Sequence, residues 1–345
     1  MLRLTTTTAL VMLSTTAMAE VPRVLTDIAP IHSLVAQVMG DLGAPDLLVP
    51  AGGDAHHMAL RPSDARLLDQ AQVVVWVGES LTPWLDEPLR TLAPTAATLT
   101  LQEVAGWTPR MYPDADDRDD HEGHDDHADH DDHDDHADHD HDHDEHADHD
   151  HDDDHDHAGD DHADHDDHAG HVHTGLDPHA WLDPVAAKVW VGAIRDTLTA
   201  TDPDNAATYA ANATDAMQRL DTLTDQLTTT LAGVPAGSWL APHDAFGYFE
   251  ERFSVPSAGA VADSEAVAPG AARLSDLRER VSGGTVSCVL FEVNTADDLA
   301  RTLTDGTTAK TAAISVAGAG LEPGPALYST LLTSIADTLV DCTAS

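Results

Sequence analysis

The chain has 345 residues and carries 62 Asp and Glu against 16 Lys and Arg, which gives a formal net charge of -46. A surface of that sign repels phosphate backbones, so nucleic acid is not expected as a partner. The length exceeds that of a small domain held together by metal or disulfides alone and supports one large or two medium domains.

The charge is concentrated in a His/Asp-rich segment, residues 114–173, which holds 29 of the acids, 19 of the 24 histidines and one base, Arg118. Its other residues are Ala, Gly and Val172, so it offers little apolar surface to offset the entropy of ordering. We expect this segment to be disordered without ligand and to bind several zinc ions weakly and collectively. The alternative is a spacer that only aids solubility.

The N-terminus, residues 1–19, has the pattern of a cleaved secretory signal. It places Arg3 before a short apolar run and ends in Ala17-Met18-Ala19. No later stretch approaches the roughly 18 apolar residues that cross a bilayer, so we expect a soluble periplasmic protein. The only two cysteines, Cys288 and Cys342, are expected to form a disulfide in that oxidising compartment.

Short apolar runs alternate with helical patterns on both sides of the His/Asp-rich segment. The strands predicted before it are residues 23–28, 46–49, 73–77 and 98–101, and the helices are residues 30–39, 62–71 and 82–92. The strands predicted after it are residues 239–242, 257–261, 286–292 and 311–316, and the helices are residues 245–252, 270–281 and 325–340. This alternation predicts an α/β fold with two (β/α)4-type lobes.

A long helix is predicted between the lobes, because residues 204–232 contain no Gly or Pro and follow Asp202-Pro203. Its apolar stripe comprises Tyr209, Ala213, Met217, Leu220, Leu223, Leu227 and Leu231. Such a helix spans about 40 Å and makes large closure of the lobes unexpected. The expected domains are the signal (1–19), the N-terminal lobe (20–113 and 174–201), the His/Asp-rich segment (114–173), the linking helix (202–232) and the C-terminal lobe (233–345).

Five histidines lie outside the His/Asp-rich segment: His32, His56, His57, His179 and His243. His56 and His243 follow predicted strands and His179 follows the segment, and ligands of open α/β sheets bind beyond the carboxyl ends of strands. Three imidazoles suit Zn²⁺ with one coordination position left over. Each one also fits a structural or surface role, and spacing alone does not bring the three together.

The sequence around these three histidines resembles the zinc-specific solute-binding proteins of bacterial ABC uptake systems, the ZnuA-type proteins. The resemblance is carried by residues 52–64, 177–184 and 243–249 and extends over essentially the whole mature chain. It implies that His56, His179 and His243 are zinc ligands. It also implies a monomer that captures Zn²⁺, hands it to an inner-membrane permease driven by an ATPase, and catalyses no reaction. The pairing of Cys288 with Cys342 matches a bridge in several zinc-type members.

The fourth coordination position departs from the family. Many relatives place a carboxylate in an Asp-Pro-Leu-Gly segment, which here reads Ile314-Ser315-Val316-Ala317-Gly318, and some zinc members have Glu where this chain has Ala55. The candidates left open are a water, a histidine of the His/Asp-rich segment, His57 and Glu292. Glu292 is alternatively a hydrogen-bond partner of a ligand imidazole.

Three further residues near these motifs are expected to be structural. We interpret His32 as a structural histidine, and Asp177 and Asp244 as local cap or turn residues.

Two other functions remain open from the sequence. An exported metal-storage protein would act through the His/Asp-rich segment alone. A hydrolase would use the three histidines to activate water. The chain has no His-Glu-x-x-His helix and no nucleophile elbow, which disfavours the hydrolase.

Overall fold

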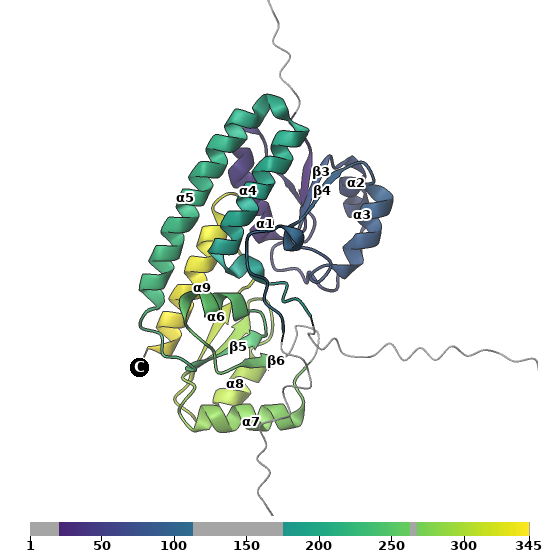
Figure 1. Cartoon of the computed structure of the whole chain (residues 1–345). Coiled ribbons are helices and arrows are strands. Elements are labelled where there is room, and N and C mark those ends of the chain that lie inside the picture. Colours follow the sequence, from purple (N-terminus) through teal and green to yellow (C-terminus); the bar gives the residue numbers. More distant parts are fainter. Residues whose placement is uncertain (1–20, 113–174, 263–267, 345) are drawn as a thin grey trace, which may run out of the picture. The chain divides into compact units, whose positions relative to one another are not determined.

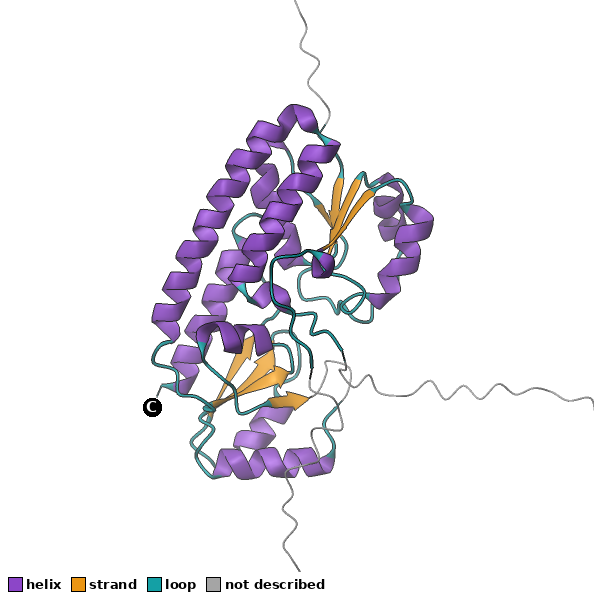
Figure 2. Cartoon of the chain, viewed as in Figure 1, coloured by secondary structure: helices purple, strands orange, loops and turns teal. Residues whose placement is uncertain are grey.

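The computed structural model describes residues 21–112, 175–262 and 268–344, and within them the chain forms two lobes, each built on a parallel sheet (Figures 1 and 2). The α/β fold with two lobes predicted from the sequence is thereby confirmed. The predicted signal (1–19) and the His/Asp-rich segment (114–173) lie outside the described residues.

The two sheets have the same topology. The N-terminal sheet contains β1 (Val24–Thr26), β2 (Asp46–Leu47), β3 (Val73–Trp76) and β4 (Ala97–Thr100) in the order β2-β1-β3-β4. The C-terminal sheet contains β5 (Trp239–His243), β6 (Ala260–Ala262), β7 (Cys288–Glu292) and β8 (Lys310–Ile314) in the order β6-β5-β7-β8. Every pairing is parallel. In each sheet the strand order reverses beside the first strand, which creates a crevice at its carboxyl end.

Helices cover both faces of each sheet (Figure 2). They are α1 (Ala29–Met39), α2 (Pro62–Gln70), α3 (Asp86–Leu92), α4 (Pro184–Thr201), α5 (Ala206–Leu231), α6 (Gly247–Phe253), α7 (Ala271–Ser282), α8 (Asp298–Thr304) and α9 (Leu327–Thr343). The predicted helices and strands agree with these bounds to within a few residues, but α4 and α8 were not predicted. None of the helices in the described part of the chain is long and apolar enough to span a bilayer.

Strand β3 shows why a continuous apolar run forms a central strand here. Its side chains alternate between two cores, Val73 and Val75 on one face of the sheet and Val74 and Trp76 on the other. Because the side chains of a strand point alternately to its two faces, burial on both faces requires every position to be apolar.

One hydrophobic core runs through both lobes, and α5 lies along it (Figure 1). This helix packs against α1, α4 and α9. Its buried face comprises Tyr209, Ala213, Ala216, Leu220, Leu223, Leu227 and Leu231, so Ala216 is buried where the predicted stripe had Met217. The α-helix also starts later than predicted, because Pro203–Asn205 form a 3-10 turn. The carboxylate of Asp202 stabilises this turn by accepting hydrogen bonds from Asn205 Nδ2 (2.7 Å) and the Tyr209 hydroxyl (2.8 Å).

Buried hydrogen bonds and a disulfide tie α9 to the rest of the chain. The Tyr328 backbone N–H donates to Ser33 Oγ (3.0 Å), and its hydroxyl donates to the Trp181 carbonyl (2.7 Å). Cys342 of α9 forms the predicted disulfide with Cys288 of β7, with a Cα–Cα distance of 5.4 Å. The last helix is therefore fastened to both lobes.

At the carboxyl end of the N-terminal sheet, the buried side chain of Asp27 bridges the ends of β1 and β3. This residue follows β1, and its carboxylate accepts hydrogen bonds from the backbone N–H groups of Ile28 (2.8 Å) and Val77 (2.7 Å). Burial raises the pKa of Asp27 to about 7 against these hydrogen bonds. In the C-terminal sheet the equivalent strand, β5, ends on His243 instead.

Candidate metal centre

His179 lies in the turn that follows the His/Asp-rich segment, immediately before the 3-10 turn Ala180–Leu182. The Asp177 carboxylate shapes this turn, because its Oδ1 accepts the backbone N–H of His179 at 3.0 Å. The same oxygen lies 2.9 Å from the ring nitrogen Nδ1 of His179. Asp177 therefore does form a turn, as predicted, but it also orients the His179 ring. Both side chains are buried.

Arg110 and Tyr112 complete the surroundings of Asp177. Arg110 Nη1 donates to Asp177 Oδ2 at 3.0 Å, and the Tyr112 hydroxyl lies 3.2 Å from Oδ1. Burial acts to raise the pKa of Asp177, but the interactions with His179 and the charge of Arg110 outweigh it and hold that pKa below its usual value. Burial and the charge of Asp177 raise the pKa of Tyr112, which stays a neutral donor.

His243 is the last residue of β5, at the carboxyl end of the C-terminal sheet. Its side chain is buried, and its ring centroid lies 5.6 Å from that of His179. Phe246 and Trp239, at the two ends of the same segment, stack edge to face and anchor it in the core. The motif of residues 243–249 therefore places the ring of His243 beside that of His179.

His56 reaches the same place from the loop between β2 and α2. Oδ1 of Asp54 accepts the backbone N–H groups of His56 (2.8 Å) and His57 (3.1 Å), which folds the loop into an Asx turn. The Ala55 carbonyl accepts a hydrogen bond from Trp84 Nε1 at 2.7 Å. The ring centroid of His56 lies 5.8 Å from that of His179. The Asp54 side chain thus fixes the conformation of the loop that carries His56.

The structure brings the rings of His56, His179 and His243 together but does not close them into a ligand set. Among the described residues, no three His, Cys, Asp or Glu side chains form a group that could hold a metal ion as they stand. Their assignment as ligands stays a prediction. The donor types still fit zinc, since each is a single imidazole on a separate element, and rotation of a side chain changes the position of its nitrogens without moving the backbone.

The two remaining histidines of the described chain have different surroundings. His57 is half exposed, its ring centroid is 6.3 Å from that of His56, and its Nδ1 is 3.2 Å from Asp54 Oδ2. His32 is buried in α1 with Nε2 3.0 Å from the Pro45 carbonyl, which agrees with the predicted structural role.

A cavity of about 570 Å³ adjoins His243 and is lined by residues of both lobes, among them Asp54 and Glu292. Glu292 ends β7, and its Oε1 accepts the backbone N–H of Val316 at 3.1 Å. Gly52 takes a positive φ of 80° at the edge of the cavity, where a Cβ would collide with Ala319. Glycine at this position therefore permits the loops of the two lobes to approach closely.

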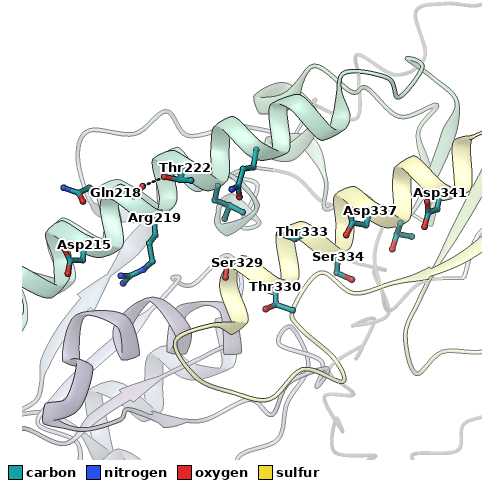
Figure 3. A pocket seen from close by; sticks show the side chains of 13 residues that line it. Asp215, Gln218, Arg219, Thr222, Ser329, Thr330, Thr333, Ser334, Asp337 and Asp341 are labelled. Carbon is teal, nitrogen blue, oxygen red and sulfur yellow. Dashed lines mark hydrogen bonds between the residues drawn. The ribbon is translucent and has the colours of Figure 1, made fainter.

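A wider groove of about 910 Å³ lies between α5 and α9 (Figure 3). Hydroxyl, amide and carboxylate side chains dominate its lining, which includes Asp215, Gln218, Thr222, Thr330, Ser334 and Asp337. It contains none of the predicted ligands. The smaller cavity is lined by one of them, His243, so chemistry rather than volume favours it as the candidate site.

Comparison with known proteins identifies the family of this chain. The family model described as "Zinc-uptake complex component A periplasmic", ZnuA, matches residues 24–342. The chain belongs to the ZnuA family. It is 42% identical over 327 residues to the high-affinity zinc uptake system protein ZnuA of Paracoccus denitrificans, covering 94% of this chain and 93% of that one. It is 38% identical over 321 residues to the protein of that name from Brucella abortus, covering 92% and 91% of the two chains.

A solved ZnuA structure shares the fold of this family member. The TM-score is 0.69 at 18% sequence identity, and the match covers 94% of this chain and 100% of that one. A ZnuA deletion variant described as zinc-bound matches with a TM-score of 0.68 at 18% identity, over 94% of this chain and 99% of that one. At such identities the comparison supports the fold alone.

Sequence reasoning missed three residues of the site neighbourhood: Arg110, Tyr112 and Tyr248. The Tyr248 hydroxyl accepts the backbone N–H of Arg110 at 2.7 Å, across 138 positions of sequence. Only Asp177, two positions before His179, carried a signal that could have been found, because a carboxylate often orients a metal-binding imidazole.

Proposed function

We propose that this chain captures Zn²⁺ in the periplasm and delivers it to an inner-membrane permease powered by a cytoplasmic ATPase. The observation that carries the proposal is the convergence of His56, His179 and His243 from three separate elements: the ring centroid of His179 lies 5.8 Å from that of His56 and 5.6 Å from that of His243. Membership of the ZnuA family and the zinc-uptake names of the relatives support zinc as the cargo.

The donor chemistry favours zinc over harder cations. Neutral imidazoles are borderline-soft ligands that suit Zn²⁺, whereas Mn²⁺ and Mg²⁺ prefer oxygen. The fourth position stays open between a water, a histidine of the His/Asp-rich segment, His57 and Glu292. The hydrogen bond from Val316 holds one oxygen of Glu292 beside the cavity that His243 lines.

We propose further that the protein is not an enzyme and acts as a monomer. A zinc hydrolase needs a general base near the metal-bound water. Asp177, the carboxylate nearest His179, has donors on both of its oxygens, which makes it a poor base. Residues 1–19 would serve as the export signal, and the His/Asp-rich segment would collect zinc weakly for transfer to the tight site.

The test is a zinc titration of the metal-stripped chain against a competing chelator, with and without residues 114–173. We expect one tight site in both forms, additional weak sites only in the full chain, and weaker binding of Mn²⁺. The affinity should fall as the pH drops through about 6.5, because imidazoles must lose their proton to bind. His179→Ala should abolish the tight site, and His32→Gln, at the buried histidine that contacts the Pro45 carbonyl, should retain it.

Two outcomes would replace the proposal by its alternatives. Absence of a tight site in the chain without residues 114–173 would favour a metal-storage protein. Zinc-dependent hydrolysis that is lost in His179→Ala would favour a hydrolase.

A further inference from the structure

The two borders of the His/Asp-rich segment are joined to each other beside His179. Met111 pairs with Leu176 in an antiparallel bridge. On either side of the bridge, the Tyr112 N–H donates to the Gly175 carbonyl and the Asp177 N–H donates to the Arg110 carbonyl, each at 2.9 Å. We call residues 110–112 and 175–177 the stem. The stem places the side chains of Arg110 and Tyr112 against the carboxylate of Asp177.

The Asp177 carboxylate is fully buried and surrounded by donors. Its Oδ1 lies within 3.2 Å of the Tyr112 hydroxyl and of both the backbone N–H and Nδ1 of His179, and its Oδ2 accepts from Arg110 Nη1. An ionised carboxylate only accepts hydrogen bonds. The proton of the neutral His179 ring must therefore sit on Nδ1, and the lone pair that can bind a metal must sit on Nε2.

Arg110 is held in this position from the other lobe. Its Nε donates to Glu251 Oε1 at 3.1 Å, and its backbone N–H donates to the Tyr248 hydroxyl. Its guanidinium lies against Gly247, where a Cβ would collide with it. Gly247 thus makes room for Arg110, whose charge neutralises the Asp177 carboxylate.

The Tyr112 hydroxyl links the Asp177 carboxylate to the motif of residues 243–249. Its hydroxyl lies 2.9 Å from the Asp244 carbonyl, next to His243, and 3.2 Å from Nδ1 of His179. The Tyr112 hydroxyl therefore contacts both the ring of His179 and the residue that follows His243.

We propose that Arg110, Tyr112 and Asp177 are positioning residues that fix the His179 ring as the Nδ1–H tautomer and present Nε2 to zinc. The inference rests on the proposed function for the role of His179 as a ligand. Outer hydrogen-bond partners of this kind orient a metal-binding imidazole and raise its basicity, and their removal weakens metal binding.

The experiment has one readout without metal and one with zinc. Long-range ¹H–¹⁵N spectra of the metal-free full chain report the tautomer of His179, whose signals are assigned by their loss in His179→Asn. We expect Nδ1–H in the wild type and a mixture of tautomers in Asp177→Asn, since an amide can donate to Nδ1 as well as accept from it. Zinc affinity at the tight site should fall about 10- to 100-fold in Asp177→Asn.

Two further variants change the surroundings of the same carboxylate. Arg110→Met removes its countercharge, and Gly247→Ala displaces Arg110 from the opposite lobe. Both should change the tautomer signals and weaken zinc binding by up to about 10-fold. Arg252→Met is the matched control, because it breaks another arginine–carboxylate pair, Arg252–Asp183, whose two hydrogen bonds of 2.7 Å do not involve His179. It should leave both readouts unchanged.

The outcomes separate this inference from the proposed function. Unchanged tautomer and zinc affinity in Asp177→Asn, with tight binding by the wild type, would overturn the positioning role alone. An Nε2–H tautomer in the wild type would also overturn it. A wild type without a tight zinc site would instead overturn the proposed function. If Asp177→Asn does not fold, Tyr112→Phe, which removes only a hydroxyl, decides by the same two readouts.

Discussion

His32 and His179 are both buried histidines, and the group facing each ring decides what the ring can do. His179 faces an ionised carboxylate, which leaves Nε2 available as a ligand atom. His32 faces the Pro45 carbonyl, so its Nε2 carries the proton, and burial lowers its pKa. The first arrangement suits metal binding, and the second suits a fixed structural contact.

His32 should make the fold sensitive to acid. Because its pKa is lower in the folded than in the unfolded chain, its stabilising contribution is complete above about pH 6.5 and is lost as the pH falls below that value. His32→Gln keeps a donor for the Pro45 carbonyl and removes the titration. In denaturant unfolding between about pH 8 and pH 5, the wild type should lose stability relative to this variant.

Comparing the wild type with His32→Gln controls for the titration of other buried groups. Asp27, whose pKa is raised to about 7, lowers the free energy of unfolding as the pH rises from about 4 to 7, which is the opposite sign. It is present in both chains and cancels in their difference. A difference between wild type and His32→Gln that does not change with pH would contradict the assignment.

The sequence pointed to His56, His179 and His243 because each lies in a local motif, and the fold brings their rings together. It could not point to Arg110, because that residue touches Asp177 and Glu251 only after the chain has folded across 67 and 141 positions. Contacts of such separation leave no periodicity or spacing in the sequence. The convergence of the three rings also required the structure, since no pattern relates a loop of one lobe to a strand end of the other.

At the scale of elements, prediction succeeded where one burial pattern dominates. Strand β3 and the stripe of α5 are clear in the sequence because each has one environment along its length. Helix α4 was missed although Ala187, Trp190, Val191, Ile194 and Leu198 are buried at helical spacing. The apolar side chain of Val185 on its exposed face reduces the contrast between the two faces. Its start did carry a signal, since Asp183 caps the helix through the Val185 N–H at 2.8 Å and Pro184 follows. Helix α8 buries only Ala300 and Leu303, which leaves a weak apolar pattern in the sequence.

The disulfide between β7 and α9 should contribute measurably to stability. It joins residues 54 positions apart, and closing a loop of that size stabilises by about 4 kcal/mol in the chain-entropy model. The double variant Cys288→Ala, Cys342→Ala should lower the free energy of unfolding by about that amount in urea. Reducing agent should lower the stability of the wild type similarly and leave the double variant unaffected. Equal midpoints for the two chains under oxidising conditions would contradict this expectation.

At the scale of the molecule, the two lobes share one core and are joined by buried polar contacts. Besides the bonds of Tyr328, the Trp181 indole donates to the Val316 carbonyl at 2.8 Å. Separating the lobes would expose these groups and part of the core, which costs far more than moving a surface hinge. The arrangement therefore favours capture by small movements of loops and side chains.

Small-angle scattering should detect this stiffness. For a chain without residues 114–173, whose own dimensions would otherwise contribute, we expect the same radius of gyration with and without zinc. A clear decrease on adding zinc, under conditions where titration shows the tight site to be filled, would indicate closure of the lobes and contradict the expectation.

The stem has a consequence for how this chain can be altered. Because the Met111–Leu176 bridge holds the two borders of residues 113–174 together, the ends of any peptide placed between them are already close in space. The entropic cost of a longer connection grows slowly, by about 0.6 kcal/mol for each doubling in length. The same position should accept new chain termini or a fluorescent domain. Such a domain would follow Tyr112, whose hydroxyl lies 3.2 Å from the Asp177 carboxylate that orients His179.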